Sequence, residues 1–379
     1  MPVEVLTYQK LLPMSVRVII SGGGTGGHIF PAISIANELK QRVKDINILF
    51  VGAKGRMEME KVPKAGFSIK GLNISGLKRS WKDARNILFP FKLISSLFKS
   101  YWIVKKYKPS VVVGTGGYAS GPLLFVASKL SIPTLIQEQN SYPGITNKLL
   151  SKSVQKICVS YENMDRFFPK SKLMMLGNPV RQDLLASADK KTDAVKYFNL
   201  DSNRKTILVL GGSLGARTIN HSIAELVQQF EEKNIQLIWQ TGISYESDAK
   251  DLCQSLSNVQ AHAFIYNMDL AYSAADIIIS RAGASTISEL CLVGKPALLI
   301  PSPNVAEDHQ TKNAMALIEK NAALMVKDSE AQEQLGQVIF DLLKNENTQQ
   351  NLGDNIKKLA MPNSAKHIVD EVLKLVQEK

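Results

Sequence analysis

Two series of short, apolar, β-branched runs follow one another along the chain, and longer segments with helical spacing separate the runs. Strands that are apolar on both faces belong to parallel sheets with helices on each side. Two such series predict two doubly wound α/β domains. The runs are 17–21, 47–51, 110–113, 134–137 and 156–159 in the first series, and 206–210, 236–240, 261–265, 276–280 and 297–300 in the second.

The length of 379 residues suits two domains of this kind. Gly, Asn and Pro punctuate the chain at 177–181 (GNPVR) and predict the boundary there. We therefore expect a first domain over 1–180 and a second over 181–363. Residues 364–379 have the spacing of an amphipathic helix, which we expect to pack back on the first domain.

The composition narrows the choice of partners. The net charge of +12 suits nucleic acid, an anionic membrane or a phosphorylated substrate. The three cysteines, Cys158, Cys253 and Cys291, lack metal-ligand spacing, and we expect them to be buried thiols. The histidines are scattered along the chain. We therefore expect neither a metal nor a cofactor. No apolar run reaches the roughly 18 residues of a membrane span, and the N-terminus does not read as a signal peptide. Met14 directly precedes the first strand, so residues 1–13 are a candidate for a dispensable extension.

A glycine-rich turn, SGGGTGGHIFP, follows the first strand at 21–31. Its backbone N–H groups, with the helix N-terminus after it, suit a diphosphate. Gly22, Gly24 and Gly27 also satisfy the dinucleotide fingerprint G-x-G-x-x-G. That site needs an acid about 20 residues later, at the end of the second strand, to hold a ribose. The second strand ends FVGAKG at 50–55 without an acid, which argues against a nicotinamide enzyme.

Three more turns follow strands. Two are rich in glycine, GTGGYASGP at 114–122 and GGSLGAR at 211–217. One such loop is a weak signal, but three at the carboxyl ends of strands favour a site for phosphate and sugar groups. The last turn, SRAGASTISE at 280–289, sets Glu289 in the first turns of a helix. Its carboxylate can accept two hydrogen bonds from a ribose diol or only complement the helix dipole, and spacing does not decide between these roles.

These motifs carry a resemblance. In chain order, GGGTGGHIFPA, ISGL, GTGGYASGP, EQN, GNPVR, GGSLGAR, RAGASTISE and DHQTKNA resemble the MurG family, from residue 17 to about residue 314. Members of that family move GlcNAc from UDP-GlcNAc to the MurNAc 4-hydroxyl of lipid I, an undecaprenyl-linked acceptor, and so make lipid II for peptidoglycan. The resemblance implies a GT-B fold, with two Rossmann-like domains facing across a cleft. It also implies a part in cell-wall biogenesis, cell shape and cell division.

The resemblance also implies roles for residues of the second domain, which would bind UDP-GlcNAc. Ser213 and the turn at 284–289 would hold the diphosphate and ribose, the backbone of Ile265 would contact uracil, and Gln310 would contact the sugar. His309 stands where some family members have a second glutamine, a departure beside the sugar contact. The residues of the turn are Ala284, Ser285, Thr286, Ile287, Ser288 and Glu289, with Glu289 on the ribose hydroxyls.

Transfer from an α-linked donor to a β-1,4 linkage inverts the anomeric centre in one in-line displacement, which needs a base. His28, at the rim of the first glycine turn, suits a base near neutral pH, and Glu138 competes for that role. His28 can instead cap the helix or bind an acceptor phosphate. Helix N-termini and Arg181, rather than a metal, would meet the charge of the departing diphosphate. By resemblance, the residues that line the cleft from the side opposite the donor site are Thr25, Gly26, Gly27, Asn140 and Arg181.

A basic, aromatic segment predicts a membrane contact. Residues 77–109 hold nine Lys or Arg and one acid, Asp83, with aromatic side chains between them. Such a segment suits an anionic membrane surface, and no nucleic-acid module is present. We expect the contact in a loop at 77–89 through Trp81, Leu88 and Phe89. The expected location is therefore peripheral, on the cytoplasmic face of the cell inner membrane. We expect the residues with helical spacing after the loop to be core: Leu93, Leu97, Tyr101 and Val104.

Three alternatives remain open from the sequence. Another GT-B glycosyltransferase could use a diacylglycerol-like acceptor, and a nucleotide-sugar epimerase could use UDP-GlcNAc without a lipid. A non-catalytic sugar-nucleotide-binding regulator is the third. Release of UDP in the presence and absence of a lipid I analogue separates them.

Overall fold

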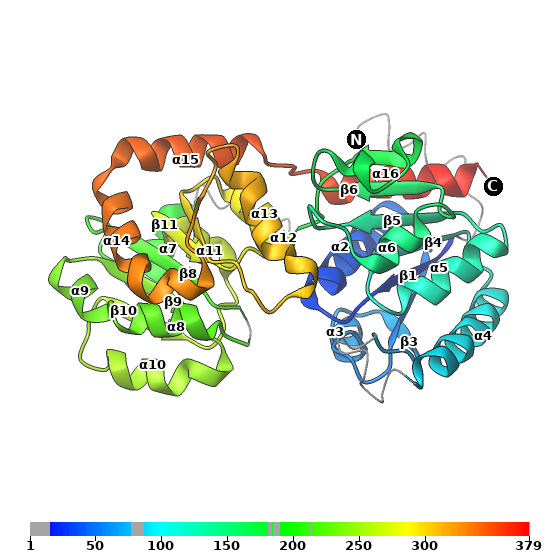
Figure 1. The fold of residues 1–379 in the computed structure, drawn as a ribbon, viewed down its shortest axis with the longest axis horizontal. Coiled ribbons are helices and arrows are strands. Elements are labelled where there is room, and N and C mark those ends of the chain that lie inside the picture. The colour runs from blue at the N-terminus through cyan, green and yellow to red at the C-terminus, as the bar shows by residue number, and fades with distance from the viewer. Residues whose placement is uncertain (1–15, 77–86, 181–183, 185–189, 213, 379) are drawn as a thin grey trace. The chain divides into compact units, whose positions relative to one another are not determined.

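The computed structural model describes residues 16–76, 87–180, 184, 190–212 and 214–378. The chain divides into two compact units (Figure 1). The N-terminal unit comprises Met1–Val180 and Asn363–Lys379, and the C-terminal unit comprises Arg181–Pro362. Each unit is built on one parallel sheet with helices on both faces, so the predicted fold class is confirmed.

The sheet of the N-terminal unit has seven strands in the order β3-β2-β1-β4-β5-β6-β7. The order reverses between β1 and β4, which is where ligands bind in open parallel sheets. The strands are β1 (Arg17–Gly22), β2 (Asn47–Ala53), β3 (Ser68–Leu72), β4 (Val111–Gly116), β5 (Thr134–Glu138), β6 (Lys156–Val159) and β7 (Leu173–Met175). The helices are α2 (Gly26–Arg42), α3 (Glu58–Lys64), α4 (Phe89–Tyr107), α5 (Ser120–Lys129), α6 (Ile145–Leu150) and α16 (Ser364–Gln377).

Alternate residues of β1 bury on opposite faces of this sheet, as the continuous apolar run requires. Val18 and Ile20 pack with side chains of α2 and of the C-terminal helix α16. Ile19 packs on the other face with side chains of α4 and α5. The helix α16 lies against α2 and β4, so the last residues of the chain complete the core of the N-terminal unit.

The sheet of the C-terminal unit has six strands in the order β10-β9-β8-β11-β12-β13. The strands are β8 (Thr206–Leu210), β9 (Gln236–Gln240), β10 (Val259–His262), β11 (Ile277–Ser280), β12 (Ala297–Leu299) and β13 (Leu324–Met325). The helices are α7 (Lys191–Tyr197), α8 (Arg217–Ala224), α9 (Val227–Glu232), α10 (Glu246–Cys253), α11 (Met268–Ala274), α12 (Ala284–Val293), α13 (His309–Ile318), α14 (Ala331–Lys344) and α15 (Glu346–Lys358).

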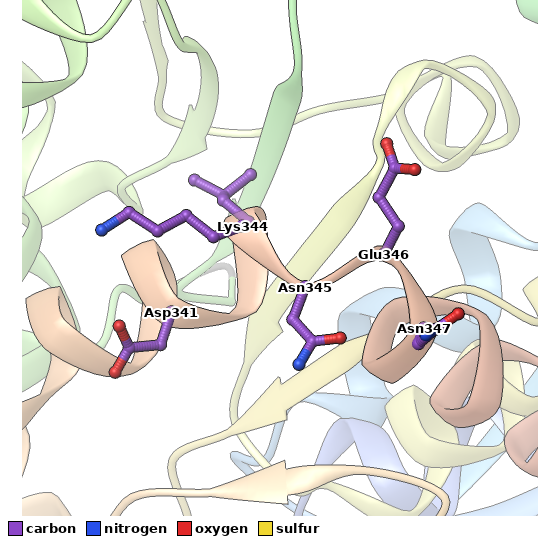
Figure 2. Close-up of a pocket in the computed structure, with 6 residues that line it drawn as sticks. Asp341, Lys344, Asn345, Glu346 and Asn347 are labelled. Atoms are coloured by element: carbon purple, nitrogen blue, oxygen red, sulfur yellow. The ribbon is translucent and has the colours of Figure 1, made fainter.

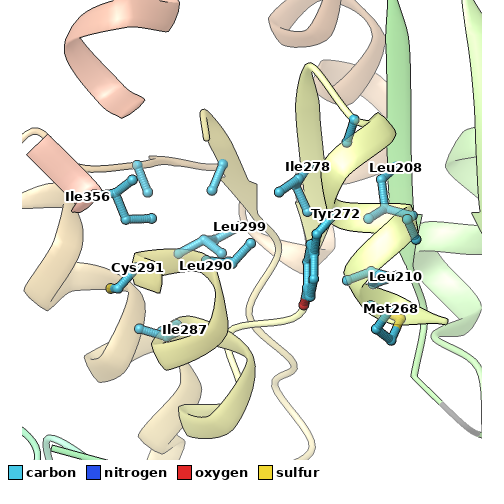
Figure 3. Close-up of a cluster of buried hydrophobic side chains, with 14 of the residues drawn as sticks. Leu208, Leu210, Met268, Tyr272, Ile278, Ile287, Leu290, Cys291, Leu299 and Ile356 are labelled. Carbon is cyan, nitrogen blue, oxygen red and sulfur yellow. The ribbon is translucent and has the colours of Figure 1, made fainter. Parts of the chain in front are cut away.

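The core on one face of this second sheet positions two elements that matter below. Leu208, Tyr272 and Leu290 meet there, and Figure 3 shows Tyr272 of α11 among the apolar side chains of β8, β11 and α12. The packing fixes α11 and α12 against the same strands. Side chains at the start of α12 are therefore held relative to α11.

The apolar pattern missed three strands, and each of them lies at an edge of its sheet: β3, β7 and β13. An edge strand has one strand neighbour and stays partly exposed, so its sequence carries a weaker apolar signal. The edge strand β10 is also displaced, covering Val259–His262 where the pattern predicted 261–265.

All three cysteines are buried, as the sequence predicted. Burial raises the pKa of the Cys253 thiol to about 11 and that of the Cys291 thiol to about 12. Cys158 is fully buried, and burial raises the pKa of its thiol further. Thiols of this kind stay protonated and fill the core as small apolar groups.

A surface hollow lies at the junction of α14 and α15, away from the turns at the carboxyl ends of the strands (Figure 2). Asn345 lies in it and caps α15, because its side chain accepts a hydrogen bond from the Thr348 N–H over 2.9 Å. Asn345 thus has a structural role at this helix junction.

Candidate functional site

The first two glycine turns contact each other at the point where the strand order reverses. Gly23 N donates a hydrogen bond to Gly116 O over 3.3 Å, so the turn after β1 lies on the turn after β4. Gly117 has a φ of +90°, and a Cβ there would lie 2.4 Å from Gly23 O. Only glycine therefore allows this approach of two backbones.

A buried carboxylate, that of Glu58, accepts a hydrogen bond from the backbone of the first turn. Glu58 has no exposed surface, and its oxygens accept hydrogen bonds from Gly24 N and Ala53 N, each over 2.9 Å. A negative charge already satisfies one N–H of this turn, which disfavours a diphosphate beside it. Sequence analysis missed Glu58, which lies three residues beyond the segment searched for a ribose-binding acid.

Helix α2 starts directly after the first turn, and its first residues are the predicted contacts Gly26 and Gly27. Thr25 is the N-cap, with an extended backbone, an exposed side chain and no hydrogen bond from that side chain to the helix. The Thr25 hydroxyl is thus available to a ligand. His28, in the first turn of the helix, is half-buried, and its carbonyl accepts a hydrogen bond from Thr115 Oγ1 over 2.7 Å.

The His28 imidazole is held on one side only. Its Nδ1 lies 2.9 Å from Gln139 Oε1, and the ring packs against Gly116, where a Cβ would lie 2.7 Å from Nδ1. Within the described parts of the chain, Nε2 makes no hydrogen bond. An imidazole with one nitrogen engaged and the other open has the arrangement of a general base.

The surroundings of Glu138, the other sequence-based candidate for the base, differ from those of His28. It is 1% exposed, at the end of β5. Its Oε1 accepts from Asn140 N over 3.0 Å and Oε2 accepts from Asn147 Nδ2 over 2.8 Å. Further bonds come from Asn140 Nδ2 and Gly144 N. Four donors therefore occupy both carboxylate oxygens, and two of these donors belong to Asn140 in the loop after β5.

In the C-terminal unit, Glu289 of α12 is half-buried and oriented by a neighbour. Tyr272 OH donates a hydrogen bond to Glu289 Oε2 over 2.9 Å, and Tyr272 itself is fully buried. The carboxylate is therefore fixed near the start of the helix by Tyr272. Sequence analysis gave no signal for Tyr272, because 17 residues separate it from Glu289.

The N-terminus of α12 suits an anion. Gly283 caps it with an extended backbone, and no acidic residue occupies the first turn. Ser285 Oγ is buried and lacks a hydrogen-bond partner among the residues with a described position. Thr286 lies beside it, Ile287 is buried in the core, and Ser288 Oγ donates to Ala284 O over 3.0 Å.

Two other predicted contacts of this unit, Ile265 and Gln310, are each held by a hydrogen bond between a backbone N–H and a side-chain amide oxygen. Ile265 is buried, and its N–H donates to Gln240 Oε1 over 3.1 Å. Gln310 is half-buried at the start of α13, and its Oε1 accepts from Ser302 N over 2.9 Å. That bond points the amide oxygen of Gln310 at the backbone and leaves its NH₂ group to face a ligand. Arg181 and Ser213 lie outside the described residues.

Helix α4 exposes an apolar stripe rather than burying all of its large side chains. Leu88 precedes the helix and is exposed, Phe89 begins it and is half-buried, and Trp81 lies outside the described residues. Val104 is buried as expected, Leu93 and Leu97 are partly buried, and Tyr101 is 39% exposed, so its assignment to the core is wrong. The stripe consists of Phe91, Ile94, Phe98 and Trp102, each more than half exposed.

Lysines flank this stripe. Lys54, Lys70, Lys99 and Lys106 line a shallow cavity with Trp102. Burial, followed by the charges of Lys54 and Lys70, lowers the pKa of Lys99. No helix in the described part of the chain has the length and apolarity to cross a membrane. The same part also lacks a cluster of three His, Cys, Asp or Glu side chains placed to hold a metal.

Comparison with known proteins assigns the class. Residues 18–159 match the glycosyltransferase family 28 N-terminal domain, and residues 206–368 match the C-terminal domain of the same family. With two parallel-sheet units and these matches, the fold is GT-B and the protein is a hexosyltransferase. A UDP-GlcNAc 2-epimerase from Neisseria meningitidis shares the fold at 19% identity, with a TM-score of 0.65 over 95% of this chain and 100% of that one.

More similar relatives narrow the class. One from Flavobacterium psychrophilum is 58% identical over 96% of this chain and 98% of its own length, and one from Parabacteroides distasonis is 53% identical over 96% and 99%. Both are named UDP-N-acetylglucosamine--N-acetylmuramyl-(pentapeptide) pyrophosphoryl-undecaprenol N-acetylglucosamine transferase. The crystal structure of Acinetobacter baumannii MurG matches with a TM-score of 0.77 and 30% identity, over 95% of this chain and 99% of that one. The chain belongs to this family of transferases, as the motifs predicted.

Proposed function

We propose that the protein transfers GlcNAc from UDP-GlcNAc to the MurNAc 4-hydroxyl of lipid I and so makes lipid II, with inversion at the anomeric carbon. Membership of the transferase family supports the two substrates. The observation that carries the chemistry is the His28 imidazole at the junction of two glycine turns, with Nδ1 engaged and Nε2 open.

His28 Nε2 is the base in this proposal. It takes the proton of the acceptor 4-hydroxyl as that oxygen attacks the anomeric carbon, and the bond from the anomeric carbon to the UDP oxygen breaks in the same step. Glu138 keeps its four donors throughout and holds Asn140 in the loop beside the acceptor. Thr25, Gly26 and Gly27 complete the acceptor side.

The C-terminal unit binds the donor. The N-terminus of α12, with Ser285 and Thr286, receives the diphosphate, and Glu289 accepts hydrogen bonds from the ribose diol while Tyr272 holds it. Uracil meets the backbone at Ile265, and the Gln310 NH₂ group donates to the sugar. Ser213 and Arg181 contribute to holding the diphosphate. The leaving charge is met by helix N-termini and arginine, without a metal.

The N-terminal unit docks on an anionic membrane through α4. The apolar stripe of Phe91, Ile94, Phe98 and Trp102 enters the interface, and the flanking lysines attract acidic head groups. Leu88, Phe89 and Trp81 also belong to the proposed contact. A lipid-linked acceptor requires such docking, which places the protein peripherally on the cytoplasmic face of the inner membrane.

The test is a product assay with purified protein, UDP-GlcNAc and a lipid I analogue. We expect release of UDP that depends on the analogue, together with a β-1,4-linked disaccharide lipid. Formation of the 2-epimer of the sugar nucleotide without lipid would identify an epimerase and refute the proposal. Preference for a diacylglycerol acceptor over the lipid I analogue would refute the assigned acceptor.

A further inference from the structure

We propose that Gln139 is a positioning residue, whose amide oxygen holds His28 in the tautomer with the proton on Nδ1 and the free electron pair on Nε2. The inference rests on the proposed role of His28 as the base. Gln139 itself is fully buried. It therefore acts on the reaction only through the imidazole.

The orientation of the Gln139 amide follows from its other hydrogen bonds. Its Nε2 donates to Thr115 O over 2.8 Å and to Gln137 O over 3.1 Å. A flipped amide would set its oxygen against these two carbonyl oxygens, at the cost of both bonds. The oxygen must therefore face His28 Nδ1, 2.9 Å away. An amide oxygen only accepts, so Nδ1 carries the hydrogen and the neutral ring keeps Nε2 as its acceptor.

The amide is anchored further by a buried chain of amides. Gln139 Nε2 also donates to Gln137 Oε1, and Gln137 Nε2 donates to Asn178 Oδ1 over 2.8 Å. Asn178 Nδ2 returns a bond to Gln139 O over 3.1 Å. Gln137 is fully buried and Asn178 is 3% exposed. From Gln139 to Gln137 to Asn178, each amide nitrogen donates to the amide oxygen of the next side chain, so the series runs in one sense, from His28 inward.

The ring has little freedom to leave this partner. Thr115 Oγ1 holds the backbone of His28, and Gly116, at a φ of +102°, packs against the imidazole. Any Cβ at Gly116 would lie 2.7 Å from the ring atoms Cε1 and Nδ1. Close packing on one face and an oriented acceptor at Nδ1 define both the position and the tautomer of the base, as second partners do for other functional histidines.

Nuclear magnetic resonance of protein with ¹⁵N-labelled histidine tests the tautomer directly, with His28→Asn identifying the signal. In the full-length native protein above the titration of the ring, we expect His28 to carry its hydrogen on Nδ1. In Gln139→Met, which keeps the side-chain length but removes the acceptor, we expect a mixture of tautomers. A native ring protonated on Nε2 would overturn the inference, and this measurement does not depend on whether any variant of Gln139 folds.

Kinetics separate positioning from structural support. We expect Gln139→Met to lower kcat roughly 10- to 100-fold with little change in the KM for UDP-GlcNAc, by analogy with the loss of a hydrogen-bond partner from a metal-ligating histidine. Gln137→Met removes a buried amide of the same chain that does not touch His28, and it should lower kcat much less. Equal losses of kcat in the two variants would show that Gln139 only supports the fold.

A double variant completes the test. His28→Asn keeps an N–H toward Gln139 but has no basic nitrogen, so adding Gln139→Met to it should cause no further loss of turnover. A full additional loss would overturn the positioning role. Unchanged turnover in His28→Asn alone would instead refute His28 as the base, which is a failure of the proposed function and distinguishable from failure of the Gln139 assignment.

Discussion

The turn after β1 and the turn after β11 have similar local construction, but different groups stand behind them. Both join a buried parallel strand to a helix that has no acid in its first turn. Behind the first turn lies the carboxylate of Glu58, and an imidazole occupies the first turn of its helix. The turn after β11 has a helix N-terminus and the buried hydroxyl of Ser285, which lacks a hydrogen-bond partner among the residues that the structure describes.

The difference separates two kinds of chemistry. A carboxylate behind the first turn disfavours a diphosphate and leaves the turn as a frame for His28, where a proton can be accepted. An uncompensated helix N-terminus with a free hydroxyl favours phosphate oxygens. Strand-to-helix turns of similar local construction can therefore suit either proton transfer or anion binding, depending on the groups that surround them.

The largest expected effect comes from removing the imidazole of the first turn. His28→Ala should lower kcat by roughly 10²-fold or more, because general base catalysis contributes about that much. The Kd of UDP-GlcNAc, measured by calorimetry, should stay within about twofold, since we assign the donor site to the other unit. Near-normal turnover would remove the proton-transfer role from the first turn.

A change in the helix that follows the turn after β11 should affect binding of UDP-GlcNAc more than turnover. Glu289→Ala should weaken UDP-GlcNAc binding roughly 10- to 100-fold, because two hydrogen bonds to a carboxylate are lost. Glu333→Ala, an exposed acid on α14, is the matched control and should leave the Kd unchanged. Equal donor affinity in the two variants would mean that Glu289 only complements the helix dipole.

The two units should also differ in membrane binding, since we assign the membrane contact to the N-terminal unit alone. Phe98→Ser with Trp102→Ser should reduce partition into vesicles with acidic lipid about tenfold, because two aromatic groups no longer enter the interface. Tyr266→Ser removes an aromatic ring of the C-terminal unit that is 82% exposed, and it should have no effect. Vesicle binding that depends equally on Tyr266 would contradict the assignment.

The smallest expected effect concerns the support of the first turn. Glu58→Gln turns an NH₂ group toward one of two backbone N–H donors and should lower the free energy of unfolding by about 1–3 kcal/mol. Glu60→Gln, at an exposed ion pair with Lys64, should change it by less than about 1 kcal/mol. Thermal unfolding compares the two variants. Tighter UDP-GlcNAc binding by Glu58→Gln would show that the first turn does take phosphate.

Much of the fold could be predicted because local patterns of apolar residues indicate its strands and helices. Central strands such as β1 and β8 are apolar on both faces, and their runs were found at nearly their observed bounds. The edge strands β3, β7 and β13 were missed, because partial exposure relaxes the need for an apolar run. Tyr101 was assigned to the core on helical spacing, since spacing defines a face of a helix without saying how wide the covered part is.

By itself, the sequence determined the two doubly wound sheets, the glycine turns at their carboxyl ends, and the family, because each depends on residues close together in the chain or on the order of motifs. Only the tertiary structure decided what the turns can do. Glu58 supports Gly24 from 34 positions away, and Gln139 meets His28 across 111. These partners come together only because the strand order puts β2 on one side of β1, and β4 and β5 on the other. Strand order is a property of the packed sheet, and no local pattern encodes it.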